Sequence, residues 1–209
     1  LNNTNFDKLR RIRLSGGEPF LTKNLKWFLE LLDEKIDLSK IIFTCNTNGS
    51  VFPDEQILKI LKKFKRLIID VSVDATEKLA ESIRFGVKWR QIENNIKKWN
   101  KITKHMTLYT CVYVLNVNRL QDIINLGYSY KYMPLIEPRY LKHTQIPLSF
   151  RKKWLTTDDY VNRIIMMDFE PYDSRKTLTA IKNMDTEMNV FSDVNPEIIS
   201  VLSKYEKNY

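Results

Sequence analysis

From about residue 12 onward, the sequence alternates between short β-rich runs and longer segments whose apolar residues recur at helical spacing. This alternation is typical of repeated βα units, in which the strands run parallel within one sheet. We therefore expect an α/β fold with a mostly parallel sheet. The β-rich runs predict five strands, at Arg11–Ser15, Ile41–Cys45, Leu67–Asp74, Met106–Leu115 and Tyr130–Ile136.

The strand signal ends near Pro138, and helical patterns take over. They lie at about 158–167 and 175–188, and a last helix is predicted to start at Asn195 and Pro196, a capping residue followed by a first-turn proline. We expect residues 1–145 to form the core and residues 146–209 to form a helical C-terminal extension.

The composition is that of a globular protein, with 43% hydrophobic and 28% charged residues. No run approaches the ~20 apolar residues that cross a bilayer, and no signal segment is recognisable, so a cytoplasmic protein without a membrane partner is expected. Cys45 and Cys111 both fall in predicted strands, which favours small buried side chains over a disulfide.

The net charge of +9 suits an acidic partner such as nucleic acid. Lysines on a solvated helix face explain the same charge without any partner, and no nucleic-acid motif accompanies them. Both interpretations stay open. The basic residues form two clusters, the first with Lys59, Lys62, Lys63, Lys65 and Arg66, and the second with Arg151, Lys152 and Lys153.

Polar groups lie at the carboxyl ends of four of the predicted strands, where parallel sheets gather their ligands. They are Gly16-Gly17-Glu18-Pro19, Asn46 to Ser50, the pair Ser72 and Asp74, and Asn116. Bare glycine backbone suits an amino group, amides and hydroxyls suit a ribose, and Arg84 suits a carboxylate. Together they predict a pocket for an amino-acid nucleoside. Taken alone, Arg84 also fits a surface salt bridge and Ser72 a satisfied strand hydroxyl.

Three segments resemble the core of radical S-adenosylmethionine (SAM) enzymes, over roughly positions 9 to 140. They are Leu14-Ser15-Gly16-Gly17-Glu18-Pro19, Asn46-Thr47-Asn48-Gly49, and Val71-Ser72-Val73-Asp74-Ala75 with Ile83-Arg84 behind it. The resemblance implies an incomplete (β/α)6 TIM-like barrel, in which reductive cleavage of SAM gives a 5′-deoxyadenosyl radical that abstracts a substrate hydrogen. The later helices resemble, more weakly, the twitch extension of phage and bacterial members.

The resemblance also implies roles for individual residues. Gly16, Gly17, Glu18 and Pro19 would bind the methionyl amino group of SAM, chiefly through backbone. Ser72 and Arg84 would hold the methionyl carboxylate or the ribose hydroxyls, with Asn48 and Asp74 in support and Asn116 near the ribose or adenine. No catalytic residue is assigned. The implied electron donor is a flavodoxin or ferredoxin, and the substrate class stays open among peptides, nucleosides and RNA.

The sequence departs from the family at its metal site. The family binds a 4Fe-4S cluster through a C-x3-C-x2-C loop after the first barrel strand, and this chain has no such triplet. Cys45 and Cys111 lie far apart in the sequence, and His105 and His143 make no tight set with them, so no metal ligands are predicted here. The first strand of this chain would correspond to the second strand of the family.

We therefore expect an N-terminally truncated fragment that lacks the first βα unit. Its full-length form would be an active enzyme with SAM and a 4Fe-4S cluster, and this chain alone would be inactive. A naturally cluster-free relative is the competing explanation. The alternatives from other functional classes are a non-catalytic SAM-binding or nucleotide-binding module and a basic adaptor that binds nucleic acid.

Overall fold

The computed structural model describes residues 6, 8–170, 174–188 and 191–206. The chain divides into two compact units. Unit 1 consists of residues 1–72 and 90–108, and unit 2 of residues 73–89 and 109–209.

Five parallel strands form one sheet in the order in which they occur in the chain. They are β1 (Arg11–Leu14), β2 (Ile42–Thr47), β3 (Arg66–Ser72), β4 (Met106–Val112) and β5 (Tyr130–Pro134). A doubly wound sheet reverses its strand order at a switch point, whereas strands in unbroken sequence order are typical of a segment of a (β/α) barrel. The α/β class and the single parallel sheet predicted from the sequence are confirmed.

The strand boundaries differ from the predicted ones by a few residues. Strand β2 extends through Asn46 and Thr47, because these residues still pair with Asp70 and Val71 of β3. The other four strands end earlier than predicted, so Asp74 lies in the segment beyond β3 rather than inside the strand.

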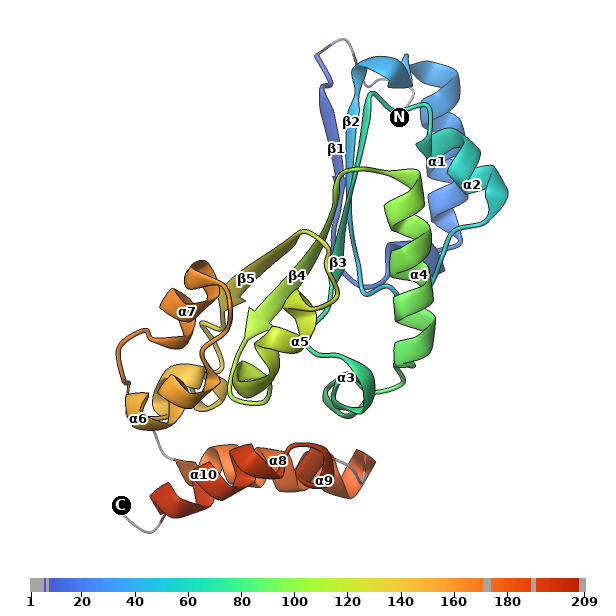
Figure 1. Cartoon of the computed structure of the whole chain (residues 1–209). Coiled ribbons are helices and arrows are strands. Elements are labelled where there is room, and N and C mark those ends of the chain that lie inside the picture. The colour runs from blue at the N-terminus through green and yellow to red at the C-terminus, as the bar shows by residue number, and fades with distance from the viewer. Residues whose placement is uncertain (1–5, 7, 171–173, 189–190, 207–209) are drawn as a thin grey trace. The chain divides into compact units, whose positions relative to one another are not determined.

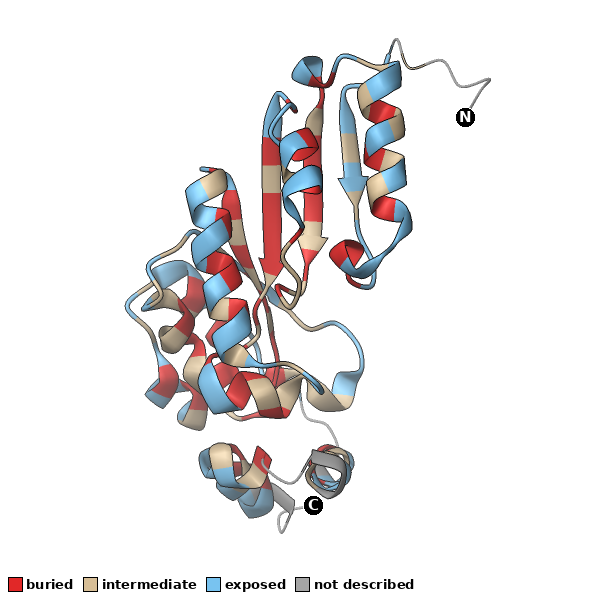
Figure 2. Ribbon diagram, turned by 90° about the vertical axis from the view of Figure 1, so that its right-hand side faces the viewer, coloured by how far each residue is buried: buried red, intermediate tan, exposed pale blue. Residues whose placement is uncertain are grey.

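Three helices of unit 1 lie on one face of strands β1 to β3 (Figure 1). They are α1 (Asn24–Lys35), α2 (Glu55–Leu61) and α4 (Trp89–Ile102), which belongs to this unit from its second residue onward. Leu29, Leu61 and Trp99 of these helices are fully buried, as are Phe43 and Ile69 of the sheet. Figure 2 shows the same contrast, with β2 and β3 buried over most of their length and β1 exposed or intermediate.

The ring of Trp99 joins two loops to helix α4. Its centroid lies 5.3 Å from that of Phe20 and 4.8 Å from that of Phe52. Phe20 belongs to the short 3₁₀ helix Pro19–Leu21 that follows β1, and Phe52 belongs to the loop that follows β2. Aromatic pairs in such tilted arrangements contribute about 1 kcal/mol each beyond their burial. Helix α4 thereby supports the loops at the carboxyl ends of β1 and β2.

Unit 2 is mostly helical after β5, as the sequence predicted. Its helices are α3 (Glu77–Ile83), α5 (Leu120–Ile124), α6 (Leu148–Arg151), α7 (Asp159–Ile165), α8 (Ser174–Met188), α9 (Phe191–Val194) and α10 (Pro196–Glu206). Further 3₁₀ helices lie at Leu38–Lys40 in unit 1, and at Val117–Arg119, Arg139–Leu141, His143–Gln145 and Lys152–Trp154 in unit 2. Within the described residues, no helix is long and apolar enough to cross a membrane.

Hydrogen bonds tie the C-terminal helices of unit 2 to β5 and to the segment after β4. The side chains of Asn195 and Asn118 exchange hydrogen bonds at 2.8 and 3.0 Å, and Asn195 also donates to the carbonyl of Leu115, at 3.0 Å. The Tyr160 hydroxyl on α7 donates to the backbone carbonyl of Tyr132 on β5, at 2.8 Å. Asn195 directly precedes α10, at the predicted capping position, and its side chain is used to anchor the helix to the segment after β4.

Arg151, the first residue of the second predicted basic cluster, does not lie on the surface. Arg151 is fully buried and donates to the backbone carbonyls of Ile146, Ile165 and Met167. A guanidinium used in this way connects the start of the C-terminal region to the end of α7 and offers no charge to a surface partner. Only Lys152 and Lys153 of that cluster are exposed.

Candidate functional site

The Gly-Gly turn after β1 adopts a backbone conformation that favours glycine. Gly16 has φ of +98° and Gly17 has φ of +55°. A Cβ at either position would meet nothing within 4 Å, so the left-handed conformation is what requires glycine here, rather than close packing. The turn therefore presents bare backbone at the carboxyl end of β1.

The side chain of Glu18 is bound by three groups of unit 1. Its carboxylate accepts hydrogen bonds from the Phe20 N–H at 3.2 Å, the Asn48 N–H at 2.8 Å and the Thr47 hydroxyl at 2.8 Å. Only 9% of the residue is exposed, and no lysine or arginine in the described part of the chain pairs with it. Three neutral donors thus satisfy a buried carboxylate that has no cationic partner among the described residues.

The loop after β2 is fixed by its own polar groups. The Gly49 N–H donates to the Thr47 hydroxyl at 3.0 Å, and the Ser50 N–H donates to the Asn48 side-chain oxygen at 2.8 Å. Gly49 has φ of +76°, and a Cβ there would lie 3.0 Å from Val71 Cγ1. This glycine is required by both backbone conformation and space. The Asn48 side chain, assigned to ligand support, closes the turn.

Ser72 ends β3 with its hydroxyl available. The residue is partly exposed, and no described residue of the chain makes a hydrogen bond with its side chain. Its neighbours Val71 and Val73 are buried, as alternation along an extended chain places them on the opposite face from Ser72. The alternative of a satisfied strand hydroxyl is therefore not what the structure shows within the described residues.

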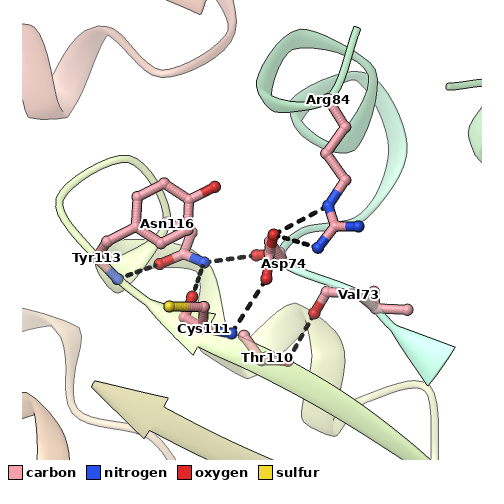
Figure 3. A network of polar contacts seen from close by, with 7 residues as sticks. All are labelled: Val73, Asp74, Arg84, Thr110, Cys111, Tyr113 and Asn116. Atoms are coloured by element: carbon pink, nitrogen blue, oxygen red, sulfur yellow. Dashed lines mark hydrogen bonds and ion pairs between the residues drawn. The ribbon is translucent and has the colours of Figure 1, made fainter. Parts of the chain in front are cut away.

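Asp74 and Arg84 form the centre of a polar network in unit 2 (Figure 3). Arg84 donates from Nε at 2.9 Å and from Nη2 at 2.6 Å to the same carboxylate oxygen of Asp74. The other oxygen accepts from the Cys111 N–H at 3.1 Å. The two side chains are 30% and 11% exposed, so this ion pair is partly buried rather than a surface salt bridge. No described residue accepts a hydrogen bond from the remaining guanidinium N–H groups of Arg84.

Asn116 completes this network from within the protein. It is fully buried, and its amide nitrogen donates to the backbone carbonyls of Asp74 and Cys111, each at 2.8 Å, while its oxygen accepts from the Tyr113 N–H at 3.0 Å (Figure 3). Every polar atom of the side chain therefore has a protein partner. Asn116 fixes the backbone on both sides of the network. Burial, together with the charge of Asp74, raises the pKa of Tyr113 well above its usual value.

The predicted site residues thus fall into two groups, one in each unit. Gly16, Gly17, Glu18, Pro19 and Asn48 belong to the group in unit 1, together with Ser72 at the end of β3. Asp74, Arg84 and Asn116 form the group in unit 2. Sequence reasoning missed Thr47 and Asn95, which donate to Glu18 and to the Gly49 carbonyl. Thr47 lies inside a recognised motif, whereas Asn95 lies on a helix with no motif to point to it.

The described residues do not fit an iron–sulfur cluster. Cys45 is buried, and burial, with Glu18 and Asp70 nearby, raises the pKa of its thiol to about 12. Burial and the Asp74 charge raise the pKa of Cys111 to about 11, although this residue is only partly buried, contrary to the prediction. Both cysteines are free, and no group of three or more His, Cys, Asp or Glu residues in the described ranges could hold a metal ion. Cluster ligation requires thiolates, which these environments disfavour.

Comparison with protein families identifies the class to which this fold and these motifs belong. The model of the radical SAM superfamily matches residues 3–127, which is more than half of the chain. The chain belongs to the radical SAM superfamily. Among curated protein sequences, none is significantly similar to it.

Solved structures of three proteins are similar to the chain at low identity. Streptococcus suis SuiB bound to S-adenosylmethionine shares 20% identity, with a TM-score of 0.45, over 74% of this chain and 35% of that one. The structure of anSMEcpe with bound AdoMet shares 18% identity, with a TM-score of 0.49, over 66% of this chain and 39% of that one. The structure of TYW1 with a lysine-pyruvate adduct bound shares 13% identity, with a TM-score of 0.43, over 85% of this chain and 50% of that one. The chain spans half or less of the length of each.

Proposed function

We propose that this chain is the SAM-binding portion of a radical SAM enzyme. The observation that carries the proposal is the arrangement of the family's motif residues at strand ends, within a chain whose residues 3–127 match the superfamily. Each motif leaves one suitable group without a hydrogen-bond partner among the described residues: backbone at Gly16 and Gly17, a hydroxyl at Ser72, and guanidinium N–H groups at Arg84. These groups fit the amino, hydroxyl and carboxylate groups of an amino-acid nucleoside.

The proposed roles follow from what each group has left to offer. The backbone of the Gly16–Pro19 turn binds the methionyl amino group. Ser72 and Arg84 hold the methionyl carboxylate or the ribose hydroxyls. Asn48 and Asp74 support them through the turn and the ion pair, and Asn116 fixes the backbone near the ribose or adenine.

The iron–sulfur cluster would come from outside the described residues. We propose that a βα unit with the C-x3-C-x2-C loop pairs with the open edge of β1. Two observations support this. Ile12 and Leu14 are only half-buried, although their sheet neighbours Phe43 and Cys45 are fully buried, and Trp27 of α1 is 60% exposed. The chemistry that SAM supplies with a reduced cluster is hydrogen abstraction from a substrate.

Substrate and electron donor are proposed only as classes. A flavodoxin or ferredoxin would supply the electron, and a peptide, nucleoside or RNA would be the substrate. The helices of residues 146–209 would act as a short twitch-like extension, and a cytoplasmic location is proposed for the whole protein.

Calorimetric titration of the purified chain with SAM tests the proposal. We expect saturable binding that Arg84→Ala weakens at least 10-fold (about 1.4 kcal/mol), the loss expected for one charge-assisted contact. Arg90→Ala removes an exposed charge six residues away and serves as the control. Absence of binding to the wild-type chain, or equal affinity of the Arg84→Ala variant, would show that the SAM-binding residues are wrongly assigned.

A nucleic-acid adaptor is the second candidate, favoured by the net charge of +9. The structure offers nucleic acid fewer unpaired basic groups than the sequence suggested. Arg151 is buried, and Lys63 pairs with Asp33 at 2.6 Å. Binding to a DNA or RNA oligonucleotide that falls steeply with added salt would favour this function. No binding at low salt would remove it.

A further inference from the structure

We propose that Thr47, on strand β2, and Asn95, on helix α4, are positioning residues for the amino-group site of SAM. The inference rests on the proposed SAM binding. In this inference, the side chains of Thr47 and Asn95 hold the Gly-Gly turn in position without contacting SAM themselves. Both are almost completely buried in unit 1, with exposures of 2% and 4%.

Thr47 connects the two loops because its hydroxyl both donates and accepts. Its oxygen lies 2.8 Å from each carboxylate oxygen of Glu18, and it accepts the Gly49 N–H at 3.0 Å. A hydroxyl has one proton, and the carboxylate can only accept, so the proton points to Glu18 and a lone pair is left for Gly49. Serine can reproduce both bonds, whereas valine, of nearly the same shape, can make neither.

Asn95 holds the other end of the same loop. Its amide nitrogen donates to the Gly49 carbonyl at 2.9 Å. Val71 Cγ1 and Ile92 Cγ2 lie 3.0 and 3.2 Å from the point where a Gly49 Cβ would be. The loop is thus enclosed by β3 and α4, and it cannot shift without losing these contacts.

Helix α4 therefore supports two of the residues that donate hydrogen bonds to Glu18. Through Asn95 and Gly49 it fixes Thr47, which donates to the carboxylate. Through Trp99, whose ring lies 5.3 Å from that of Phe20, it fixes the residue whose N–H donates to the same carboxylate. Because Glu18 follows Gly16 and Gly17 directly, its position sets the position of the turn. Loss of the Thr47 hydroxyl would leave the fold intact but allow the turn to move.

The test compares SAM with 5′-methylthioadenosine, a nucleoside that lacks the methionyl amino and carboxyl groups. Calorimetric titrations of both ligands would be run on the wild-type chain and on Thr47→Val, Thr47→Ser, Asn95→Ala and the exposed control Asn94→Ala. We expect Thr47→Val to weaken SAM at least 10-fold and methylthioadenosine less than 2-fold. Thr47→Ser should stay within 3-fold of wild type for SAM, and Asn94→Ala should be unchanged.

Amide hydrogen exchange gives a readout that needs no ligand. The Gly49 and Phe20 amides should exchange at least 10-fold faster in Thr47→Val, whereas Asn95→Ala should act mainly at the loop after β2. If Thr47→Val fails to fold, Asn95→Ala still decides the matter, because it should weaken SAM more than methylthioadenosine.

The outcomes separate the two proposals. Equal loss of both ligands, or a Thr47→Ser variant as weak as Thr47→Val, would overturn the positioning role and leave SAM binding standing. A wild-type chain that binds neither ligand would overturn the proposed function, and the positioning role with it.

Discussion

Asn116 donates to the backbone carbonyl of Asp74 at 2.8 Å, across 42 positions of sequence. The same amide group reaches the carbonyl of Cys111, also at 2.8 Å. A single buried side chain thus sets the distance between the carboxyl-terminal continuation of β3 and the end of β4. The ion pair of Asp74 with Arg84 is built on this backbone, so its geometry depends on a residue that makes no ionic contact itself.

Replacing Asn116 with alanine should destabilise the fold by about 3 kcal/mol, because two buried carbonyls and one N–H lose their partner. Urea denaturation followed by circular dichroism measures the change. Asn125→Ala is the matched control, since that amide bonds only Gln121 on the surface, and its effect should stay within about 0.5 kcal/mol. A similar small loss in both variants would contradict the network.

Gly49 and Gly86 share a φ of +76° and differ in their surroundings. Gly86→Ala should cost about 1 kcal/mol, the penalty of a left-handed alanine, because nothing lies within 4 Å of the new methyl group. Gly49→Ala should cost about 3 kcal/mol, because Val71 and Ile92 must also move. Denaturation midpoints of the two variants check this difference, and equal values would show that the loop after β2 yields easily.

His143 should make the protein less stable as the pH falls. The side chain is 1% exposed, and burial lowers its pKa from 6.5 to about 4, with the charge of Arg151 acting in the same direction. Between these two pKa values, His143 is protonated in the unfolded chain but stays neutral in the folded chain. The free energy of unfolding therefore decreases as the pH falls below about 6.5. The expected loss between pH 7.5 and pH 5 is about 2 kcal/mol.

Urea denaturation at the two pH values, on wild type and on His143→Gln, isolates this contribution. The glutamine variant should lack that part of the pH dependence. The exposed His105→Gln variant should keep it. An unchanged pH dependence in His143→Gln would mean that the ring is not held neutral by burial.

Incubation of the 209-residue chain with iron and sulfide under reducing conditions should yield no 4Fe-4S cluster. The pKa values of Cys45 and Cys111, raised to about 12 and about 11, keep both thiols protonated at neutral pH. Iron analysis and the absorption spectrum of the purified product measure the result. A stoichiometric cluster that disappears in Cys45→Ala or Cys111→Ala would show that these cysteines bind iron.

The sequence predicted the strands and the turn after β1, because local residue patterns determine both. Alternating β-rich and helical segments predicted all five strands, because each short buried strand needs a helix to cover it. The Gly-Gly turn after β1 could be located because two successive glycines favour a turn with positive φ, which both residues adopt. The strand ends themselves were uncertain by a few residues, since Asn46 and Thr47 are turn formers that nevertheless pair with β3.

Tertiary partners were beyond sequence reasoning. Nothing in the letters distinguishes Asn95, which holds the Gly49 carbonyl, from the exposed Asn94 beside it, apart from helical phase. Arg151 resembled the lysines that follow it, yet its guanidinium is buried against three carbonyls. Such contacts depend on segments that meet only after folding, so composition and spacing do not reveal them.

The Tyr160 hydroxyl, which occupies the Tyr132 carbonyl, has a consequence for self-association. Edge-to-edge polymerisation requires every copy to offer two free strand edges. Within the described residues, β5 has one backbone acceptor already taken and α7 packs against it, whereas no strand pairs with the outer edge of β1. The edge at β5 is therefore the less suitable of the two for accidental pairing with a strand of another copy.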